Sequence, residues 1–208
     1  MSEIFKHMAL AGDAWVLYIL LLSSILSIGV MFERWKTFGQ NAKGNVTDLL
    51  DGLAAFLDKR DIQGALTLAQ SCPRVEARVA LEGLKNLKKG HAYVEEVMLS
   101  KWLREKLQLE RYLIVLGTLG NNAPFVGLFG TVLGIIKAFN DLALTGQSGV
   151  SVVMAGVSSA LVATAFGILV AIPAVVANNY FVTRLKQIQT NTDALSHILL
   201  AYLKEVKS

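Results

Sequence analysis

Three long stretches of this sequence contain no Asp, Glu, Lys, Arg or His, and they restrict the possible folds more than any other feature. They cover residues 14–32, 112–136 and 142–183. Each is near or above the roughly 20 apolar residues that a helix needs to cross about 30 Å of hydrocarbon. The 53% content of hydrophobic residues and the mean hydropathy of +0.48 are typical of a membrane protein. The sequence therefore predicts an all-α membrane protein with three transmembrane helices.

The charged residues around these stretches set the predicted orientation, because positive side chains gather on the cytoplasmic side of membrane spans. Nine basic residues flank one side of the spans: Arg34, Lys36, Lys43, Lys101, Arg104, Lys106, Arg111, Arg184 and Lys186. The other side has only Lys6 and Lys137. We therefore place the N-terminus and the loop at 140–150 outside, and the C-terminus in the cytoplasm. Basic and acidic residues alternate along 33–110, which argues against a nucleic-acid partner.

The resulting division of the chain has seven segments. An amphipathic lead (1–13), transmembrane helix 1 (14–32), a cytoplasmic helical domain (33–110), transmembrane helix 2 (111–139), an outer loop (140–150), transmembrane helix 3 (151–183) and a cytoplasmic C-terminal helix (184–208) follow one another. The first span resembles a signal peptide in length. It lacks a small-residue cleavage site and ends in Glu33-Arg34-Trp35, so a retained anchor is favoured.

The cytoplasmic part carries helix signals throughout. Thr47 is expected to cap one helix and Asp61 a second, and a third runs from Val79 to Gly90. No breaker separates residues 93–139, so we predict one helix there, roughly 70 Å long. The C-terminal stretch is amphipathic as well. Transmembrane helices 2 and 3 are thus expected to extend into the cytoplasmic domain.

Two threonines occupy matching positions in the second and third spans. Thr131 follows Arg111 by 20 residues, and Thr164 precedes Arg184 by 20 residues. At about 1.5 Å per residue, both hydroxyls lie roughly 30 Å from the same membrane face. Two hydroxyls at one depth in adjacent, antiparallel helices suggest a polar ring in an apolar bundle, and hence an ion path.

Small residues recur every three or four positions along these two spans. In the second span they include Gly117, Gly120, Pro124, Gly127, Gly130, Gly134 and Ala138, and in the third Gly156, Ala160, Ala163, Gly167, Ala171 and Ala174. Such a face either lets helices pack closely or leaves room for another group. The pattern alone leaves both interpretations open.

Around the threonines the sequence resembles a known family. The run Ala123–Ile135 reads APFVGLFGTVLGI, and the third span contains ALVATAFG from Ala160 and AIPAVVAN from Ala171. These runs resemble the second and third spans of the MotA/TolQ/ExbB proton-channel family. The Glu33-Arg34-Trp35 sequence also fits it. Three predicted spans favour the TolQ/ExbB-like branch, because MotA-type stators have four.

The resemblance implies an assembly in the bacterial inner membrane, with the N-terminus in the periplasm. A homopentamer would surround two copies of a single-span, aspartate-bearing partner like TolR or ExbD, possibly with a TonB/TolA-like energy transmitter. Thr131 and Thr164 would form the polar ring of the ion pathway. Other positions are possible pore or partner-helix contacts: Gly120, Pro124, Gly127, Gly134, Ser159, Gly167, Pro173 and Asn178. The alternatives are static kinks at the prolines, a packing or backbone-bonded serine at Ser159, and interhelical hydrogen bonds at Asn178.

The chemistry of the spans independently calls for a second chain. A threonine hydroxyl can relay a proton or ligate a cation, but it does not titrate near neutral pH. Proton paths in membranes usually contain an ionisable residue, and the span interiors have none. Many TolQ and ExbB sequences carry a glutamate where this chain has Ser159, so transport of Na⁺ stays open beside H⁺. No cofactor, metal or catalytic site is expected.

The predicted function is therefore an ion-motive-force-driven channel or motor subunit, and not an enzyme. It would transmit energy to a periplasmic or outer-membrane process. The alternatives are a sodium-driven stator of a gliding motor and a non-conducting membrane scaffold.

Overall fold

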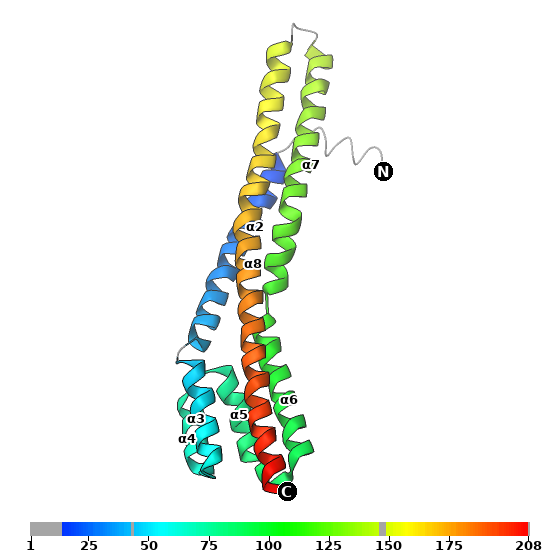
Figure 1. Ribbon diagram of the computed structural model, residues 1–208. Coiled ribbons are helices and arrows are strands. Elements are labelled where there is room, and N and C mark those ends of the chain that lie inside the picture. Colours follow the sequence, from blue (N-terminus) through cyan, green and yellow to red (C-terminus); the bar gives the residue numbers. More distant parts are fainter. Residues whose placement is uncertain (1–13, 43, 146–148, 208) are drawn as a thin grey trace. The chain divides into compact units, whose positions relative to one another are not determined.

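The computed structural model describes residues 14–42, 44–145 and 149–207, and these residues form helices and no strand. The predicted all-α fold is confirmed. The elements are α2 (Ala14–Asn41), α3 (Val46–Asp58), α4 (Ile62–Ser71), α5 (Val75–Lys85), the short 3-10 helix η1 (Leu87–Lys89), α6 (His91–Glu110), α7 (Leu113–Thr145) and α8 (Val150–Lys207) (Figure 1). The predicted lead at 1–13 lies outside the described residues. Helix α7 extends to Thr145, into the segment predicted as a loop.

Three stretches of the described chain are long and apolar enough to cross a membrane, as predicted. They lie within Ala14–Asp58, Leu113–Leu144 and Val153–Glu205. In their most apolar windows only 22%, 33% and 33% of the residues are buried. Most of the apolar surface of the spans is therefore left for lipid or for other protein chains to cover.

The chain forms two compact units. Unit 1 consists of the described residues up to Phe32 together with Tyr112–Asn179, and unit 2 of Glu33–Arg111 with the described residues from Tyr180 onward. In unit 1, α7 lies beside the first half of α8 (Figure 1). The core of this unit combines all three helices: Val16 and Leu20 of α2, Ala123 and Leu133 of α7, and Val170 and Ala171 of α8.

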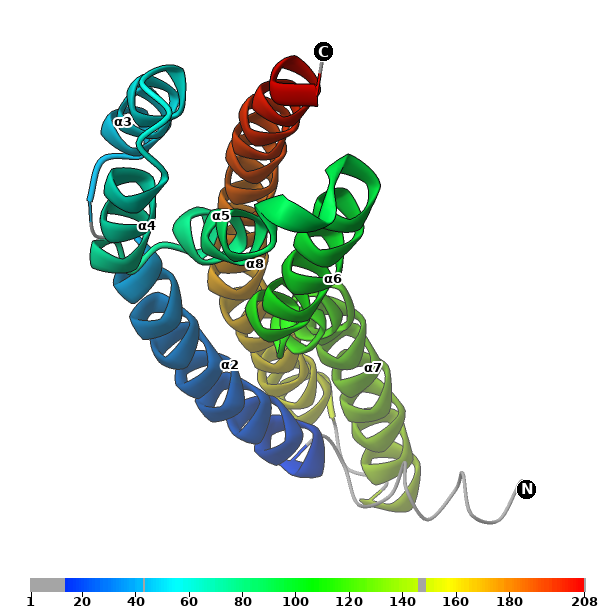
Figure 2. The same ribbon diagram turned by 90° about the horizontal axis from the view of Figure 1, so that it is seen from below.

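Unit 2 is a helical domain in which neighbours in sequence pack on one another. Helix α3 contacts α4, α4 contacts α5, and α5 contacts α6 (Figure 2). The C-terminal half of α8 approaches α5 at Gly83, where an added Cβ would lie 2.6 Å from Leu199 Cδ2. Asp61 caps α4 as predicted, since its side chain accepts from Gly64 N at 2.9 Å. The predicted cap Thr47 is wrong: Asn45 caps α3 and accepts from Thr47 N.

The prediction of one unbroken helix over 93–139 is also wrong, because α6 ends at Glu110 and α7 begins at Leu113. At the break Tyr112 has φ +63°, in the left-handed region that non-glycine residues seldom adopt. Arg34 of α2 donates from Nη1 to the carbonyls of Gln108 and Leu109, at 3.0 Å each. In a continuous helix those carbonyls would accept from amides four residues on. The guanidinium takes their place.

Candidate functional site

Thr131 of α7 and Thr164 of α8 meet inside unit 1. Their hydroxyl oxygens lie within hydrogen-bonding distance, and either one can be the donor. Thr131 Oγ1 also lies 3.2 Å from the carbonyl oxygen of Gly127 and 3.4 Å from that of Ala160. Thr131 is only 8% exposed, and Thr164 is half-buried. The two hydroxyls thus lie at matching positions of the antiparallel helices α7 and α8, as their spacing predicted, and their role in an ion pathway stays a prediction.

The pair has the hydrogen-bonding capacity of a relay. Each hydroxyl supplies one proton and two lone pairs. When Thr164 donates to Thr131, the Thr131 proton can go to the carbonyl of Gly127 or of Ala160. When Thr131 donates to Thr164 instead, the hydroxyl of Thr164 can donate its own proton to another acceptor. Two hydroxyls that share one hydrogen bond can thus pass a proton on, but they cannot hold an extra one near neutral pH.

The surroundings of the pair are apolar. Phe129 and Phe166 pack against the unit 1 core together with Trp15, whose ring meets Phe129 edge-on at 6.0 Å between centroids. A low local dielectric strengthens each hydrogen bond in such a place and raises the cost of an unpaired polar group. A charge that entered here would depend on the few oxygens of the pair and its two carbonyl neighbours.

Glycines on one side of the pair let the two helices approach closely. A Cβ at Gly127 would lie 2.6 Å from the Ala163 carbonyl oxygen, and one at Gly167 would lie 2.6 Å from the Ala123 carbonyl oxygen. Further along, a Cβ at Gly120 would lie 2.5 Å from Val175 Cγ2. Close packing within one chain is therefore what these three positions provide. Their predicted role as a face for a partner helix stays a prediction.

The remaining predicted site residues are spread over both helices. Gly134 is buried in α7, and Pro124 lies half-buried inside the same helix. Ser159 and Pro173 are on the exposed surface of α8. Asn178 is half-buried, and its amide group lies 3.6 Å from where a Cβ of Gly117 would be. The structure thus brings Thr131, Thr164, Gly127 and Gly167 together and leaves Ser159 and Pro173 outside that contact.

Sequence reasoning missed one residue that contacts the threonine pair. The Ala160 carbonyl accepts from Thr131, but in the sequence Ala160 is only one of several small residues. The signal that identifies it is positional: Ala160 is one helical turn before Thr164 and therefore projects toward the same neighbour. Among the described residues, no group of three or more His, Cys, Asp or Glu side chains could hold a metal ion.

Comparison with known proteins places this site in a matched region. The family model described as MotA/TolQ/ExbB proton channel family matches residues 72–194, which include both threonines. The Tol-Pal system protein TolQ of Pseudomonas aeruginosa is 48% identical over 81 residues, covering 39% of this chain and 35% of that protein. The biopolymer transport protein ExbB of Pseudomonas putida is 38% identical over 136 residues, covering 56% of this chain and 41% of that protein. The biopolymer transport protein ExbB of Neisseria meningitidis serogroup A is 30% identical over 212 residues, covering 88% of each chain.

Proposed function

This chain belongs to the MotA/TolQ/ExbB proton channel family, in its TolQ/ExbB-like branch, and from this premise we propose that it is the channel subunit of an ion-driven motor in the bacterial inner membrane. The observation that carries the proposal is the hydroxyl pair of Thr131 and Thr164. It is the polar contact between α7 and α8 at a depth where both helices are otherwise apolar. Hydroxyls that bond across two membrane helices also help them to pack, but two of them side by side in apolar surroundings supply the donors and acceptors that an ion path needs.

The pair supplies half of a proton site. Its hydroxyls can relay a proton through apolar surroundings, but loading and release need a group that titrates. The described spans contain no carboxylate between Leu113 and Ile136 or between Val153 and Thr183. We therefore propose a partner with one membrane span and an intramembrane aspartate, as in TolR and ExbD. The aspartate is protonated from the periplasm, passes the threonine pair and is deprotonated toward the cytoplasm.

The exposed apolar faces of the spans support an assembly of several copies. A homopentamer around two partner helices would cover part of those faces and would place five threonine pairs in one ring. Each charge that crosses 100 mV makes about 2.3 kcal/mol available. Several protons would then drive one mechanical step of the partner, and the partner would transmit it to a periplasmic or outer-membrane process.

A cation-ligating role is the second candidate. Four uncharged oxygens, from the two hydroxyls and the carbonyls of Gly127 and Ala160, gather at one place. Hard cations prefer oxygen ligands, so this arrangement also suits Na⁺. The two candidates differ in which ion gradient drives transport.

The proposal is tested by removing one hydroxyl at a time. The assembly is purified through a tag on this chain and reconstituted into vesicles, and proton and sodium fluxes are followed with ion-sensitive dyes. Thr131→Val and Thr164→Val keep the shape of the side chain, and we expect each to lower the flux at least about tenfold because the relay loses one donor and its lone pairs. Thr131→Ser and Thr164→Ser keep the hydroxyl and should retain most of the flux.

Thr118→Val is the matched control. Thr118 is an exposed threonine of the same helix α7, and its loss removes a hydroxyl without touching the pair. Undiminished flux in both threonine-pair variants would show that the ions take another route. Flux driven only by a sodium gradient would establish the cation-ligating alternative.

A further inference from the structure

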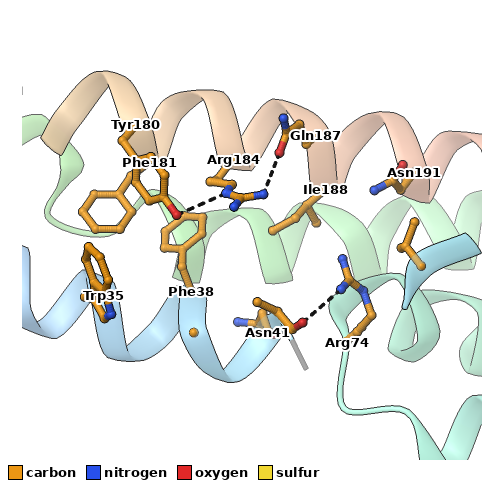
Figure 3. A pocket seen from close by; sticks show the side chains of 13 residues that line it. Trp35, Phe38, Asn41, Arg74, Tyr180, Phe181, Arg184, Gln187, Ile188 and Asn191 are labelled. Atoms are coloured by element: carbon orange, nitrogen blue, oxygen red, sulfur yellow. Dashed lines mark hydrogen bonds between the residues drawn. The ribbon is translucent and has the colours of Figure 1, made fainter. Parts of the chain in front are cut away.

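Unit 2 contains a cavity of about 460 Å³ between residues 35–41 of α2 and residues 180–191 of α8. We call it the aromatic cavity, because Trp35, Phe38, Tyr180 and Phe181 form one of its walls, and Arg74 and Arg184 also line it (Figure 3). Its volume falls in the range of ordinary small-molecule sites, which is about 300–1,000 Å³. Neither threonine of the proposed ion path belongs to it.

One part of the aromatic wall is buried and the other part is exposed. Phe38 and Phe181 pack at 5.1 Å between ring centroids and are almost fully buried. Trp35 stacks on Tyr180 at 6.3 Å with an angle of 18° between the rings, yet Trp35 is 71% exposed and Tyr180 45% exposed. Two large rings that hold each other in a fixed stack while facing outward offer a flat surface to an apolar or amphipathic ligand.

The two arginines of the cavity differ in how their charges are balanced. Arg74 donates from Nη2 to Glu76 Oε1 at 2.9 Å and from Nη1 to the Gly44 carbonyl at 3.1 Å. Glu76 is fully buried, so it neutralises Arg74 inside the protein. These contacts give Arg74 a structural role at the edge of the cavity.

Arg184 is held by neutral groups alone. Its Nε donates to the Tyr180 hydroxyl at 3.3 Å, its Nη1 donates to Gln187 Oε1 at 3.1 Å, and its guanidinium lies 5.4 Å from the centre of the Tyr180 ring (Figure 3). Within the described part of the chain, no carboxylate forms an ion pair with it. A positioned cation of this kind, exposed at the wall of a cavity, is suited to bind an anion with charge-assisted hydrogen bonds.

Chain continuity places the cavity at the edge of the bilayer. Trp35 follows the apolar run of α2, which ends at Phe32, by less than one helical turn. Arg184 directly follows the uncharged run of α8, which ends at Thr183. Tryptophan and tyrosine concentrate at this level of membrane proteins, and anionic lipids attract basic side chains there. A phosphate at this level is most readily supplied by a lipid headgroup.

We propose that the aromatic cavity binds the phosphate of an anionic phospholipid. Arg184 donates to the phosphate oxygens, while the Trp35–Tyr180 stack and the buried phenylalanines accommodate the glycerol and the first part of an acyl chain. This binding is independent of ion transport, so it can be tested without a flux assay.

The test uses the purified full chain in detergent, titrated with short-chain brominated phosphatidylglycerol. Bromine quenches nearby tryptophan, so Trp15→Phe and Trp102→Phe are introduced into every protein compared, and the quenching of Trp35, the one tryptophan left, then reports occupancy of the cavity. We expect Arg184→Gln to weaken the apparent affinity about tenfold. Lys186→Gln removes one charge two residues further along α8, outside the cavity, and should weaken the affinity less than about twofold. Arg184→Lys, which keeps the charge but loses the planar fork, should lie between them.

Two further arms identify the source of the phosphate. Brominated phosphatidylcholine should bind more weakly than phosphatidylglycerol, because it carries no net charge. Inorganic phosphate at millimolar concentration should not displace the lipid. Equal quenching in the native chain and in folded Arg184→Gln, or equal affinity for both lipids, would overturn the proposal. Displacement by inorganic phosphate would overturn the assignment to a lipid. Circular dichroism confirms that each variant is folded.

Discussion

At the scale of single residues, Gly127 determines how closely α7 approaches α8 beside the threonine pair. A methyl group at this position would lie 2.6 Å from the Ala163 carbonyl oxygen and 3.1 Å from Thr164 Cα, and both of these atoms belong to the backbone of α8. A backbone atom cannot turn aside as a flexible side chain can. The same methyl would therefore separate the helices and pull the two hydroxyls apart.

We expect Gly127→Ala to destabilise unit 1 by about 2 kcal/mol, the usual cost of overpacking. Gly29→Ala in α2 is the control, because nothing lies within 4 Å of its Cβ position, and it should gain up to about 1 kcal/mol from helix propensity. Unfolding by denaturing detergent, followed by circular dichroism, measures both. If the two variants are equally stable, the contact between α7 and α8 is looser than these distances indicate.

Residue spacing predicted the threonine pair because α7 is helical from Leu113 to Thr131 and α8 is helical from Thr164 to Arg184, although the anchor Arg111 itself lies at the break before α7. The residues that surround the pair could not be predicted from spacing. Val16 of α2, for example, lies 3.0 Å from the Cβ position of Gly130. No periodicity within α7 identifies which residue of a distant helix fills the space above a glycine. Residue spacing predicts how deep a side chain lies along its helix, whereas its neighbours depend on tertiary packing.

At the scale of elements, the break between α6 and α7 depends on Arg34. This side chain is 2% exposed, pairs with Glu33, and donates to two carbonyls near the end of α6. Sequence reasoning could not find the break, since neither glycine nor proline occurs there and the capping group is 75 residues away in the chain. Elements whose ends are set locally, such as α4 with its Asp61 cap, were predictable.

Arg34→Met should therefore destabilise unit 2 by about 3 kcal/mol, because the buried carbonyl of Leu109 and the part-buried carbonyl of Gln108 lose a charged donor. Lys36→Met removes an exposed charge of the same helix and should change stability by less than about 0.5 kcal/mol. Urea unfolding followed by tryptophan fluorescence compares the two variants. Equal stability would mean that solvent caps α6 as well as Arg34 does.

A second link between elements joins α5 to α6. Glu105 of α6 accepts from Arg78 of α5 at 2.7 Å and pairs with Lys101 at 2.9 Å. Burial raises the pKa of the Glu105 carboxyl, but the hydrogen bonds and charges of Arg78 and Lys101 together outweigh burial and leave this pKa below its ordinary value of 4.5. A lowered pKa in the folded state stabilises the fold only while the carboxylate is ionised.

This contribution is complete at pH 7 and begins to disappear as the pH falls below about 4.5, where the unfolded chain takes up the proton first. Glu105→Gln lacks it at every pH. We expect the native chain to be more stable than Glu105→Gln by about 2 kcal/mol at pH 7, and the difference to shrink between pH 4.5 and lower values. Thermal unfolding of both proteins over this range measures the difference. A constant difference would mean that the carboxylate is not the titrating group.

At the scale of the whole molecule, the three apolar stretches were sufficient to predict the architecture. Helices that cross a membrane must satisfy their backbone internally, so length and apolarity leave few alternatives. The same stretches support the proposal that this chain works together with a second chain. Their exposed faces are left for lipid or other chains to cover, and the contact between Thr131 and Thr164 has no titratable group beside it in the described spans.

Ion flux should accordingly require a second chain. In vesicles containing this protein alone, we expect no proton or sodium flux above that of empty vesicles, because hydroxyls cannot load and release a proton. Adding the single-span partner should raise the flux at least about tenfold, and replacing the partner's intramembrane aspartate by asparagine should return it to the baseline. Flux through the protein alone would contradict the half-site interpretation of the threonine pair. Flux that persists with the asparagine partner would show that the partner opens the path without carrying the proton, so the titrating group would have to be sought outside the membrane spans.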